Sequence, residues 1–446
     1  MKPWAFMLQS IVNQAIKRSM HLHNRIEELE SRRFTSSQAP LFLLKLLTSL
    51  NTQICNALIE FSNSTFVPID YDGYEALHHD VKLLASIIAN LYTYLRFAEA
   101  ACTETNPPGI ISAIERITYI LMTKTDETEV LVCPSLSCTY SYHDLLSEKN
   151  LGSKNFDSLF DKKVFEGKKH FAVFEYPVIL QNDALSHTLL MHEVGHLFNE
   201  VKSIVPNAYK VLESRRYRYN NTEELQGYLI EYVADIFAVC ILGPAFLFAF
   251  IEFLTSRALP TEALLPPHPP IIYRIRNIFD TLLFYKQRFG AFLNSPYAKN
   301  AEDYLHGLEE HLRPNKINVH KKPSYIFKYL QPALDSARRI VQNKVPAVLK
   351  FSPTPRLFDK YVIWVEKGVP PTAYQNLHGK VTPLSLGEIL NAAWLYQINN
   401  LSSSHQLPVN LQNSDYSMNL MDISRLTQLA IRQNEDLILY KRSGIL

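Results

Sequence analysis

One stretch near the middle of the chain, residues 189–198, limits what this sequence can fold into more than any other. It reads Leu-Leu-Met-His-Glu-Val-Gly-His-Leu-Phe, and Glu193 is its only acidic or basic residue apart from the two histidines, as a helix buried beneath a functional site requires. On a helix His192 and His196 lie one turn apart on nearly the same face, so both imidazoles can reach one metal ion. Gly195 leaves room for another element to pack closely against this helix.

A carboxylate is placed beside the same position. Glu193 follows the first histidine directly and projects next to the metal, where it can take a proton from a metal-bound water. A catalytic zinc ion has three protein ligands and one open position for water, so a third ligand must come from elsewhere in the chain. The alternative interpretation of residues 192–196 is an ordinary amphipathic helix with two surface histidines, because so short a motif recurs by chance.

The best candidate for the third ligand is Glu231, 35 residues after the second histidine in the sequence Glu-Tyr-Val-Ala-Asp. The surrounding residues predict a second helix that begins with a capping box of Asn221 and Glu224 and ends at Gly243–Pro244. Asp235 lies one turn beyond Glu231 on the same face. A carboxylate there can accept the free N–H of a ligand histidine, which fixes the tautomer of that histidine and raises its basicity.

His-Glu-x-x-His followed by Glu-x-x-Ala-Asp on a later helix resembles the gluzincins, the thermolysin-like branch of zinc peptidases in which the third ligand is a glutamate. The resemblance implies that His192, His196 and Glu231 bind Zn²⁺. It also implies that Glu193 is the general base and that Asp235 orients His192. The fold that it implies is a zincin-like core, in which a small sheet precedes the helix bearing the histidines.

A third segment, residues 268–275, reads His-Pro-Pro-Ile-Ile-Tyr-Arg-Ile. It is similar to the His-Pro-Pro-x-x-x-Arg-Ile segment that follows the ligand glutamate in HtpX-type and CAAX-processing membrane peptidases, and the similarity covers about residues 184–280. His268 and Arg274 are therefore candidate catalytic residues for substrate positioning or oxyanion stabilisation. The alternative is a rigid proline turn followed by an ion-paired arginine.

Those membrane peptidases carry transmembrane helices, whereas the most apolar run here, Phe237–Leu254, is interrupted by Gly243–Pro244 and closed by Glu252. A spanning helix needs about 20 apolar residues, so we expect a pair of buried core helices and no stable membrane insertion. Five cysteines and an N-terminus without the apolar core of a signal peptide favour reduced thiols and a cytoplasmic location. A net charge of +2 gives no reason to expect nucleic-acid binding.

The sequence as a whole predicts a mainly α fold with a small β-sheet, an α+β arrangement in which a zincin-like core is flanked by helical N- and C-terminal regions. We expect a helical bundle over residues 1–125, the catalytic core over 126–320 and a mostly helical accessory region over 321–446. The helical flanks are candidates for binding a regulatory partner.

Strands are predicted where β-branched and aromatic residues gather between turn formers. Glu129–Cys133 and His170–Tyr176 precede the helix with the histidines, and the second lies where the edge strand that binds a substrate backbone lies in zincins. Tyr361–Val365 predicts a short strand in the accessory region. Leu386–Leu401 predicts a helix, which Ser385 and the glutamate three residues later would cap.

The predicted function is that of a zinc-dependent metallopeptidase that hydrolyses peptide bonds with a metal-activated water and Glu193 as general base. Its substrate would be a protein or peptide, and about 350 residues outside the family-like window favour selective or regulatory cleavage over general digestion. Two alternatives stay open at this point. One is a catalytically silent scaffold in which the zinc core supports partner binding, and the other is a zinc hydrolase of non-peptide amides.

Overall fold

The computed structural model groups the chain into two compact units, each described here by itself. Unit 1 comprises Met1–Asn106, Lys124–Ser135 and His143–Val173, and unit 2 comprises Pro107–Thr123, Leu136–Tyr142 and Phe174–Leu446. The residues that the structure describes are 3–32, 39–63, 71–102, 107–122, 128–137, 139–147, 168–213, 222–256, 268–285, 321–352, 355–375, 381–404 and 420–443. The domain boundaries predicted at residues 125 and 320 lie outside these described residues.

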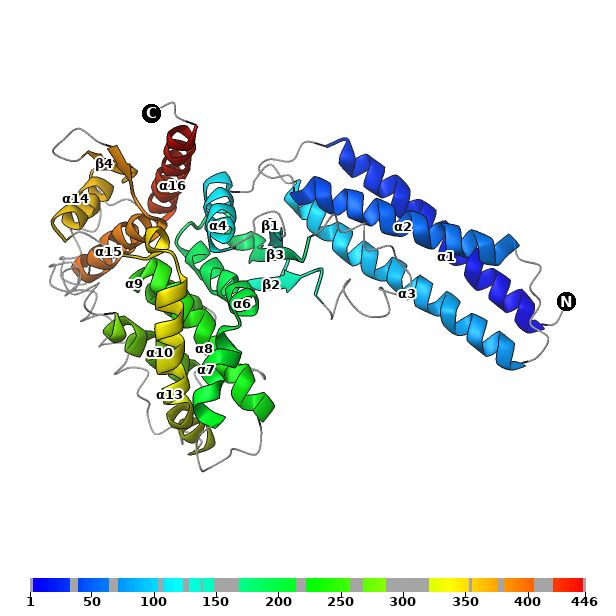
Figure 1. Ribbon diagram of the computed structural model, residues 1–446. Coiled ribbons are helices and arrows are strands. Elements are labelled where there is room, and N and C mark those ends of the chain that lie inside the picture. The colour runs from blue at the N-terminus through cyan, green and yellow to red at the C-terminus, as the bar shows by residue number, and fades with distance from the viewer. Residues whose placement is uncertain are drawn as a thin grey trace. The chain divides into compact units, whose positions relative to one another are not determined.

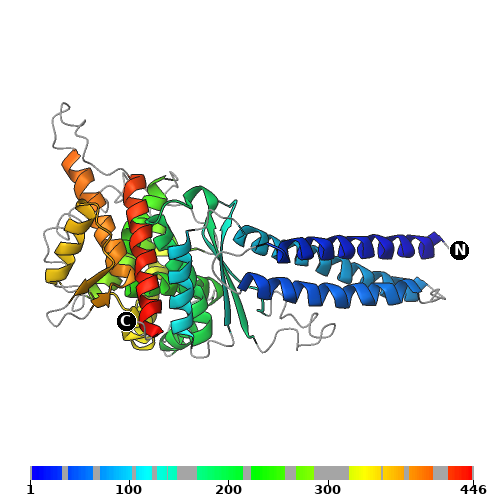
Figure 2. The same ribbon diagram turned by 90° about the horizontal axis from the view of Figure 1, so that it is seen from above.

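Unit 1 contains three long helices that run side by side, α1 (Pro3–Glu30), α2 (Ala39–Asn63) and α3 (Tyr71–Ala101) (Figure 1, Figure 2). Apolar residues at helical spacing fill the space between these helices. In α2 they include Leu43, Leu47, Leu50, Ile54 and Leu58, all fully buried. The described residues of unit 1 therefore contain a bundle of three helices, α1, α2 and α3. Asn51 adds a polar contact inside it, because its amide donates to the Ser19 carbonyl over 2.9 Å.

The small sheet has three strands in the order β1-β3-β2, with β1 at Thr128–Ser135, β2 at Ser141–Asp144 and β3 at His170–Pro177. The strands predicted at Glu129–Cys133 and His170–Tyr176 are both present. The prediction that His170–Tyr176 is an edge strand is wrong, because β3 lies between the other two. Its nearly continuous buried run, Phe171–Phe174, is typical of a strand covered on both faces.

Unit 2 is built around α8 (Thr222–Leu242), which packs against α6, α7, α9, α10, α13 and α15. The bounds of these helices are Leu190–Lys202 (α6), Ile204–Glu213 (α7), Pro244–Ser256 (α9), Ile271–Phe284 (α10), Lys321–Lys344 (α13) and Leu386–Ser404 (α15). Every residue of α8 from Glu231 to Leu242 is buried, as expected of a helix that is apolar on nearly all sides.

The break between α8 and α9 falls at Gly243, as predicted. Its φ of +61° is a left-handed conformation, and a Cβ there would lie 2.3 Å from the Phe351 ring. The two helices that it separates are buried in unit 2, so the predicted pair of core helices is confirmed. By length and composition alone, two described helices, α2 and α8, could cross a membrane, but 83% of the apolar window of α8 is buried within the protein.

Eight further described elements belong to unit 2. They are α4 (Pro108–Leu121), η3 (Val178–Leu180), η4 (Ser186–Leu189), η5 (Ala347–Leu349), α14 (Pro355–Glu366), β4 (Ala373–Gln375), β5 (Val381–Pro383) and α16 (Leu420–Arg442). In both ribbon views α4 lies beside α16, its neighbour from the far end of the sequence (Figure 1, Figure 2). Arg116 pairs there with Glu435, with its Nε 2.5 Å and its Nη2 2.8 Å from the carboxylate oxygens.

Two predictions for the accessory region had different outcomes. The capping box of α15 is confirmed, because the Ser385 amide donates to Glu388 over 2.8 Å and the Glu388 amide donates back to Ser385 Oγ over 3.2 Å. The strand predicted at Tyr361–Val365 is wrong, since these residues belong to α14. Tyr361, Val362 and Val365 are buried at helical spacing, so packing against α15 outweighs the strand propensity of the run.

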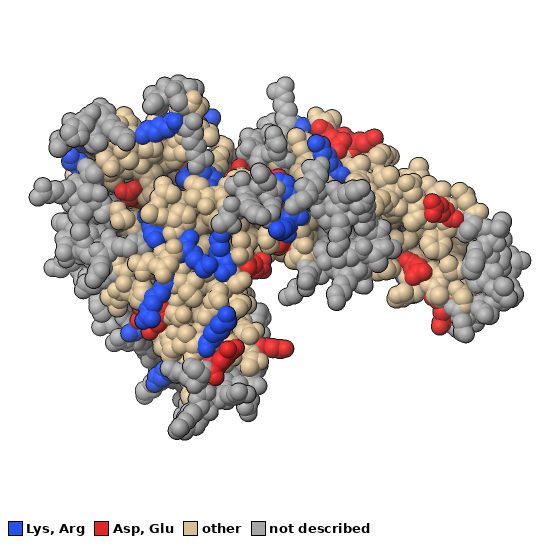
Figure 3. Space-filling model, in the orientation of Figure 1, with Lys and Arg blue, Asp and Glu red and all other residues tan. Residues whose placement is uncertain are grey.

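Charged groups are dispersed on the surface. On the face seen in Figure 3, Lys and Arg side chains and acidic ones lie among larger uncharged areas. The four described cysteines, Cys55, Cys102, Cys133 and Cys240, are all free thiols, while Cys138 lies outside the described residues.

Candidate metal centre

Close packing of α6 on α8 brings the predicted ligands together. A Cβ added at Gly195 would lie 2.9 Å from Ala234 Cα and 3.0 Å from the Ala234 carbonyl oxygen, which is nearer than a side chain can approach. The helices therefore touch backbone to backbone at this point. α6 itself follows the short helix η4, and Asp183 Oδ1 accepts hydrogen bonds from the amides of Leu185 and Ser186 over 3.1 Å and 3.3 Å just before it.

His192, His196 and Glu231 form a compact group whose ligand atoms all lie within 4.8 Å of one another. The two Nε2 atoms are 3.2 Å apart, His192 Nε2 is 3.4 Å from Glu231 Oε2, and His196 Nε2 is 3.7 Å from Glu231 Oε1. Donor atoms of a tetrahedral site with metal–ligand distances of about 2.0–2.1 Å lie roughly 3.3 Å apart. The residues present therefore fit a metal ion, and a small tetrahedral one in particular.

Asp235 orients His192 from the side opposite to the ligand atoms. His192 Nδ1 lies 2.9 Å from Asp235 Oδ1, so the carboxylate accepts the Nδ1 proton and Nε2 is directed at the group of ligands. Asp235 is fully buried. The position predicted for it from the sequence, one turn beyond Glu231, is the position in which the structure brings it to His192.

Arg274 lies at the same carboxylate. Its Nη2 and Nε donate to Asp235 over 2.7 Å and 3.0 Å in a bidentate ion pair, and its Nη1 is 3.6 Å from Glu231 Oε2. Its side chain is only 13% exposed. The ion-paired arginine that the sequence left open as an alternative is thus the geometry observed, while a catalytic role for Arg274 stays a prediction.

α10, which carries Arg274, is fixed to its neighbours by a second buried network. Arg338 of α13 donates to Asn277 Oδ1 over 2.9 Å and to Thr281 Oγ1 over 3.0 Å. Asn277 in turn donates to the carbonyl of Tyr232 over 3.1 Å, directly beside the Glu231 position on α8. These bonds fix the position of α10 on α8, and with it the position of the Arg274 guanidinium beside Asp235.

His268 approaches from a more open side. Its Nδ1 lies 3.0 Å from Glu231 Oε2, and its side chain is 47% exposed. Glu231 Oε2 is buried and has no well-directed hydrogen bond among the described residues, despite these close nitrogen atoms. A buried carboxylate oxygen in that state is suited to a cation. His268 is the predicted substrate-positioning residue that solvent reaches, and that role stays a prediction.

Opposing electrostatic effects act on the ligands. Burial and the Arg274 charge lower the pKa of His192, but the neighbouring carboxylates of Asp235 and Glu231 overcome them and raise it to about 9. Burial and the charge of the first histidine lower the pKa of His196 to about 4. Burial raises the pKa of Glu231, yet His192, His268 and Arg274 bring it well below its usual value. The carboxylate charge is thus retained inside the protein.

Glu193 differs from the other acids of the site. Burial is the main influence on its carboxyl group and raises its pKa above the usual value, against the charges of His192 and Arg274. A general base works best when its pKa lies near the working pH, and burial is the usual means of raising that of a glutamate. The environment of Glu193 therefore suits proton transfer.

Two aromatic residues of α9 border the site, and the sequence did not single them out. The Phe246 ring lies parallel to that of His192, with centroids 6.3 Å apart and planes at 4°, and the Phe250 ring lies 4.7 Å beneath the guanidinium of Arg274. Both belong to the apolar run predicted as core, and nothing in that run distinguishes a residue facing the site from one facing elsewhere.

Tyr142 of β2 was also missed. Its ring is parallel to that of His196 at 6.5 Å, and its hydroxyl donates to Glu200 over 2.7 Å. A signal was present, because Tyr140 and Tyr142 alternate with small and polar residues, a spacing typical of a half-buried strand.

Comparisons with protein-family models, with curated proteins and with solved structures found no match to this chain. The functional argument therefore rests on the site itself. The described residues contain a buried group of two histidines and one glutamate that could hold a metal ion, and its spacing is compatible with zinc.

Proposed function

We propose that the protein is a zinc-dependent metallopeptidase in which His192, His196 and Glu231 hold the ion. The observation that carries the proposal is the set of donor distances, 3.2 Å, 3.4 Å and 3.7 Å, together with the Asp235 contact that directs His192 Nε2 toward them. When bound, zinc supplies a Lewis acid that polarises a carbonyl oxygen and lowers the pKa of a water ligand. The peptide bond is the substrate that the resemblance to gluzincins implies.

The remaining chemistry belongs to side chains. Glu193 accepts a proton from the attacking water and delivers it to the leaving nitrogen, which requires no covalent intermediate. Asp235 holds the Nδ1 proton of His192 throughout, and Arg274 keeps Asp235 ionised by lowering the pKa of its carboxyl group against the effect of burial. His268, at the exposed side of Glu231, is placed to donate a hydrogen bond to a substrate oxygen.

Metal analysis and single substitutions test the proposal. We expect about one zinc per purified chain, its loss in His192→Ala, and its retention in Glu193→Gln, with hydrolysis of a peptide library reduced at least about 10²-fold in the glutamine variant. The control is His79→Ala, which removes an exposed histidine of α3 and should leave both metal content and hydrolysis unchanged.

Each contrary result has a distinct meaning. Carefully purified protein without metal would remove the basis of the proposal. If Glu193→Gln keeps the zinc, the fold and the full biological effect, the centre is a scaffold. Zinc-loaded protein that cleaves no peptide in the library but hydrolyses small amides would replace the peptidase assignment with a non-peptide amidase.

A further inference from the structure

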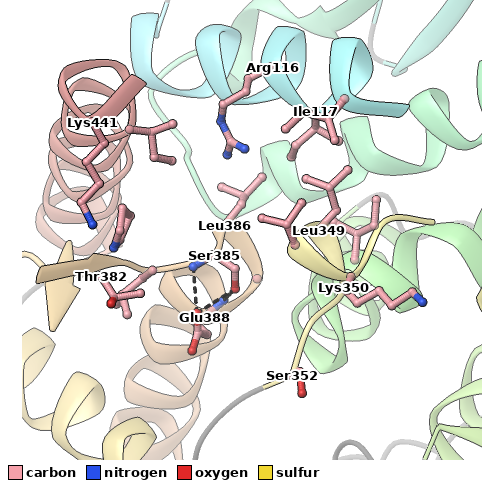
Figure 4. A pocket seen from close by; sticks show the side chains of 18 of the residues that line it. Arg116, Ile117, Leu349, Lys350, Ser352, Thr382, Ser385, Leu386, Glu388 and Lys441 are labelled. Carbon is pink, nitrogen blue, oxygen red and sulfur yellow. Dashed lines mark hydrogen bonds between the residues drawn. The ribbon is translucent and has the colours of Figure 1, made fainter. Parts of the chain in front are cut away.

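Unit 2 holds a cavity of about 790 Å³ near the C-terminal end of α8, away from Glu231 and Asp235. It is lined by residues of α4, η5, β5, α16 and the start of α15 (Figure 4). Among the described residues, α8 contributes Ile241 to the lining, and neither the proposed ligands nor Glu193 takes part. Its volume is within the range of small-molecule sites, about 300–1,000 Å³.

One part of the cavity wall is apolar. Ile117 of α4, Leu349 of η5 and Leu386 of α15 are buried and face one another across it (Figure 4). Leu384 adds a fourth buried aliphatic side chain. These side chains offer a surface for a hydrocarbon group, whose transfer from water is favourable in proportion to the apolar area that it loses.

Cationic side chains provide the polar part of the lining. Figure 4 shows Arg116 extending from α4 into the cavity and Lys441 reaching from α16 toward β5. The ion pair of Arg116 with Glu435 uses Nε and Nη2, which fixes the guanidinium and leaves Nη1 for another acceptor. Lys441 donates to the Val381 carbonyl and keeps further donors, because an ammonium group carries three.

Among the described residues of the lining, Glu388 is the acidic one, and one of its two carboxylate oxygens is bonded to the cap of α15. Its Oε2 accepts hydrogen bonds from the amide and the hydroxyl of Ser385 over 2.8 Å and 2.9 Å. Burial also raises its pKa. Lys350 is the third cation of the lining, and against Glu388 and the Glu435 that pairs with Arg116 one positive charge remains in excess.

We propose that this cavity binds a small organic acid with an apolar body, such as a medium-chain carboxylate. The acid group would be bound by Arg116 Nη1 and the Lys441 ammonium, and the hydrocarbon part would lie among Ile117, Leu349 and Leu386. This proposal is independent of the peptidase chemistry, because the two sites share no residue.

Calorimetric titration of the full-length protein tests it with three probes that share an eight-carbon chain: octanoate, octanol and octyltrimethylammonium. We expect octanoate to bind one site per chain and the cationic probe to bind at least about tenfold more weakly, because the charge-assisted hydrogen bonds are lost. Octanol should lie between them. Equal affinity for octanoate and octyltrimethylammonium would show non-specific apolar adsorption and overturn the proposal.

Substitutions locate the binding. Lys441→Ala should weaken octanoate binding about fivefold or more through the loss of one cationic donor, whereas Lys82→Ala, an exposed lysine of α3, should leave it unchanged. Ile120→Trp, at a partly exposed lining position, should fill the cavity and abolish binding while His192-dependent zinc content is retained. If Ile120→Trp fails to fold, the test rests on Lys441→Ala. An octanoate affinity that Lys441→Ala leaves unchanged overturns the proposal.

Discussion

Gly195 determines how closely the two helices of the metal centre approach, and its substitution gives the first prediction. In Gly195→Ala the new Cβ would lie 2.9 Å from Ala234 Cα, so α6 and α8 must move apart and the ligand atoms with them. We expect zinc affinity to fall about tenfold and stability by about 1–3 kcal/mol, the usual cost of overpacking. Competition with a chelator and thermal unfolding measure the two effects.

The matched control is Leu197→Met, a volume-conserving change at a fully buried position of the same helix. It should cost stability without changing zinc affinity. Equal zinc affinity in Gly195→Ala and Leu197→Met would mean that the Gly195–Ala234 contact does not set the ligand spacing.

Glu252 of α9 gives a pH-dependent prediction. Burial, with a smaller contribution from Asp183, raises the pKa of its carboxyl group from 4.5 to about 7. Between these values the folded protein retains a proton that the unfolded chain releases, so this residue's contribution to stability is complete at low pH and is lost as the pH rises toward 7. In Glu252→Gln that loss is absent.

We therefore expect Glu252→Gln to gain about 1–3 kcal/mol relative to the unsubstituted protein between pH 4.5 and pH 7.5. Urea unfolding of both proteins at the two pH values measures the difference. A difference in unfolding free energy that stays constant with pH would show that the Glu252 carboxyl group titrates normally.

The residues of the metal centre could be predicted to different extents, for physical reasons. His192 and His196, like Glu231 and Asp235, are pairs whose relation follows from the helical repeat, so their spacing in sequence already fixes their shared face. How closely the two pairs approach depends on the contact of Gly195 with Ala234. The sequence indicated only that residue 195 is small. The bidentate pair of Arg274 with Asp235 depends on how α8, α10 and α13 pack together, so it could not be derived from residues close in the sequence.

At the scale of elements, α9 forms an aromatic wall behind the metal centre and yields a prediction with a control on the same helix. Phe246 and Phe250 face His192 and Arg274, whereas Phe248 packs on Trp394 at 5.9 Å. All three phenylalanines are at most 5% exposed. We expect Phe246→Leu and Phe250→Leu to weaken zinc binding about tenfold, the cost of losing a group that orients a ligand.

Phe248→Leu should lower the free energy of unfolding as much as the other two substitutions do, by about 1 kcal/mol, and leave zinc affinity unchanged. Chelator competition and the ligand-field spectrum of the cobalt-substituted protein separate orientation from stability. If all three variants lose zinc affinity in proportion to their stability, α9 is only part of the core and orients nothing.

The errors at this scale have one cause. Tyr361–Val365 has the composition of a strand, but a helix buries three of its residues against α15, and the tertiary contact decides. His170–Tyr176 was correctly predicted as a strand, while its place in the sheet was wrong because the neighbour β2 was not recognised. Local pattern determines that a segment is extended, and pairing partners determine whether it is central or at an edge.

At the scale of the whole molecule, α4 belongs to a different unit from the segments that precede and follow it in the sequence. Its residues belong to unit 2, although Met1–Asn106 before it and Lys124–Ser135 after it belong to unit 1. The packing explains this assignment. A Cβ at Gly109 would lie 2.9 Å from the Arg432 backbone of α16, and Arg116 pairs with Glu435 on the same helix.

This assignment predicts how α4 responds when unit 1 is weakened. Leu47→Ala removes a fully buried side chain from α2 and should destabilise the bundle by about 2–5 kcal/mol. In hydrogen exchange we expect faster exchange throughout α1, α2 and α3, with α4 remaining as protected as α8, because amides exchange with the cooperative unit to which they belong. Zinc content should not change.

Leu41→Ala, at a position of α2 that is 40% exposed, is the control and should leave exchange almost unaltered throughout the chain. The informative residues are those of α4, because they follow the bundle in sequence but pack on α16. If α4 exchanges faster together with α2 in Leu47→Ala, the bundle and the metal-binding unit unfold as one body. In that case a partner that loosens the helical bundle would also loosen the metal centre.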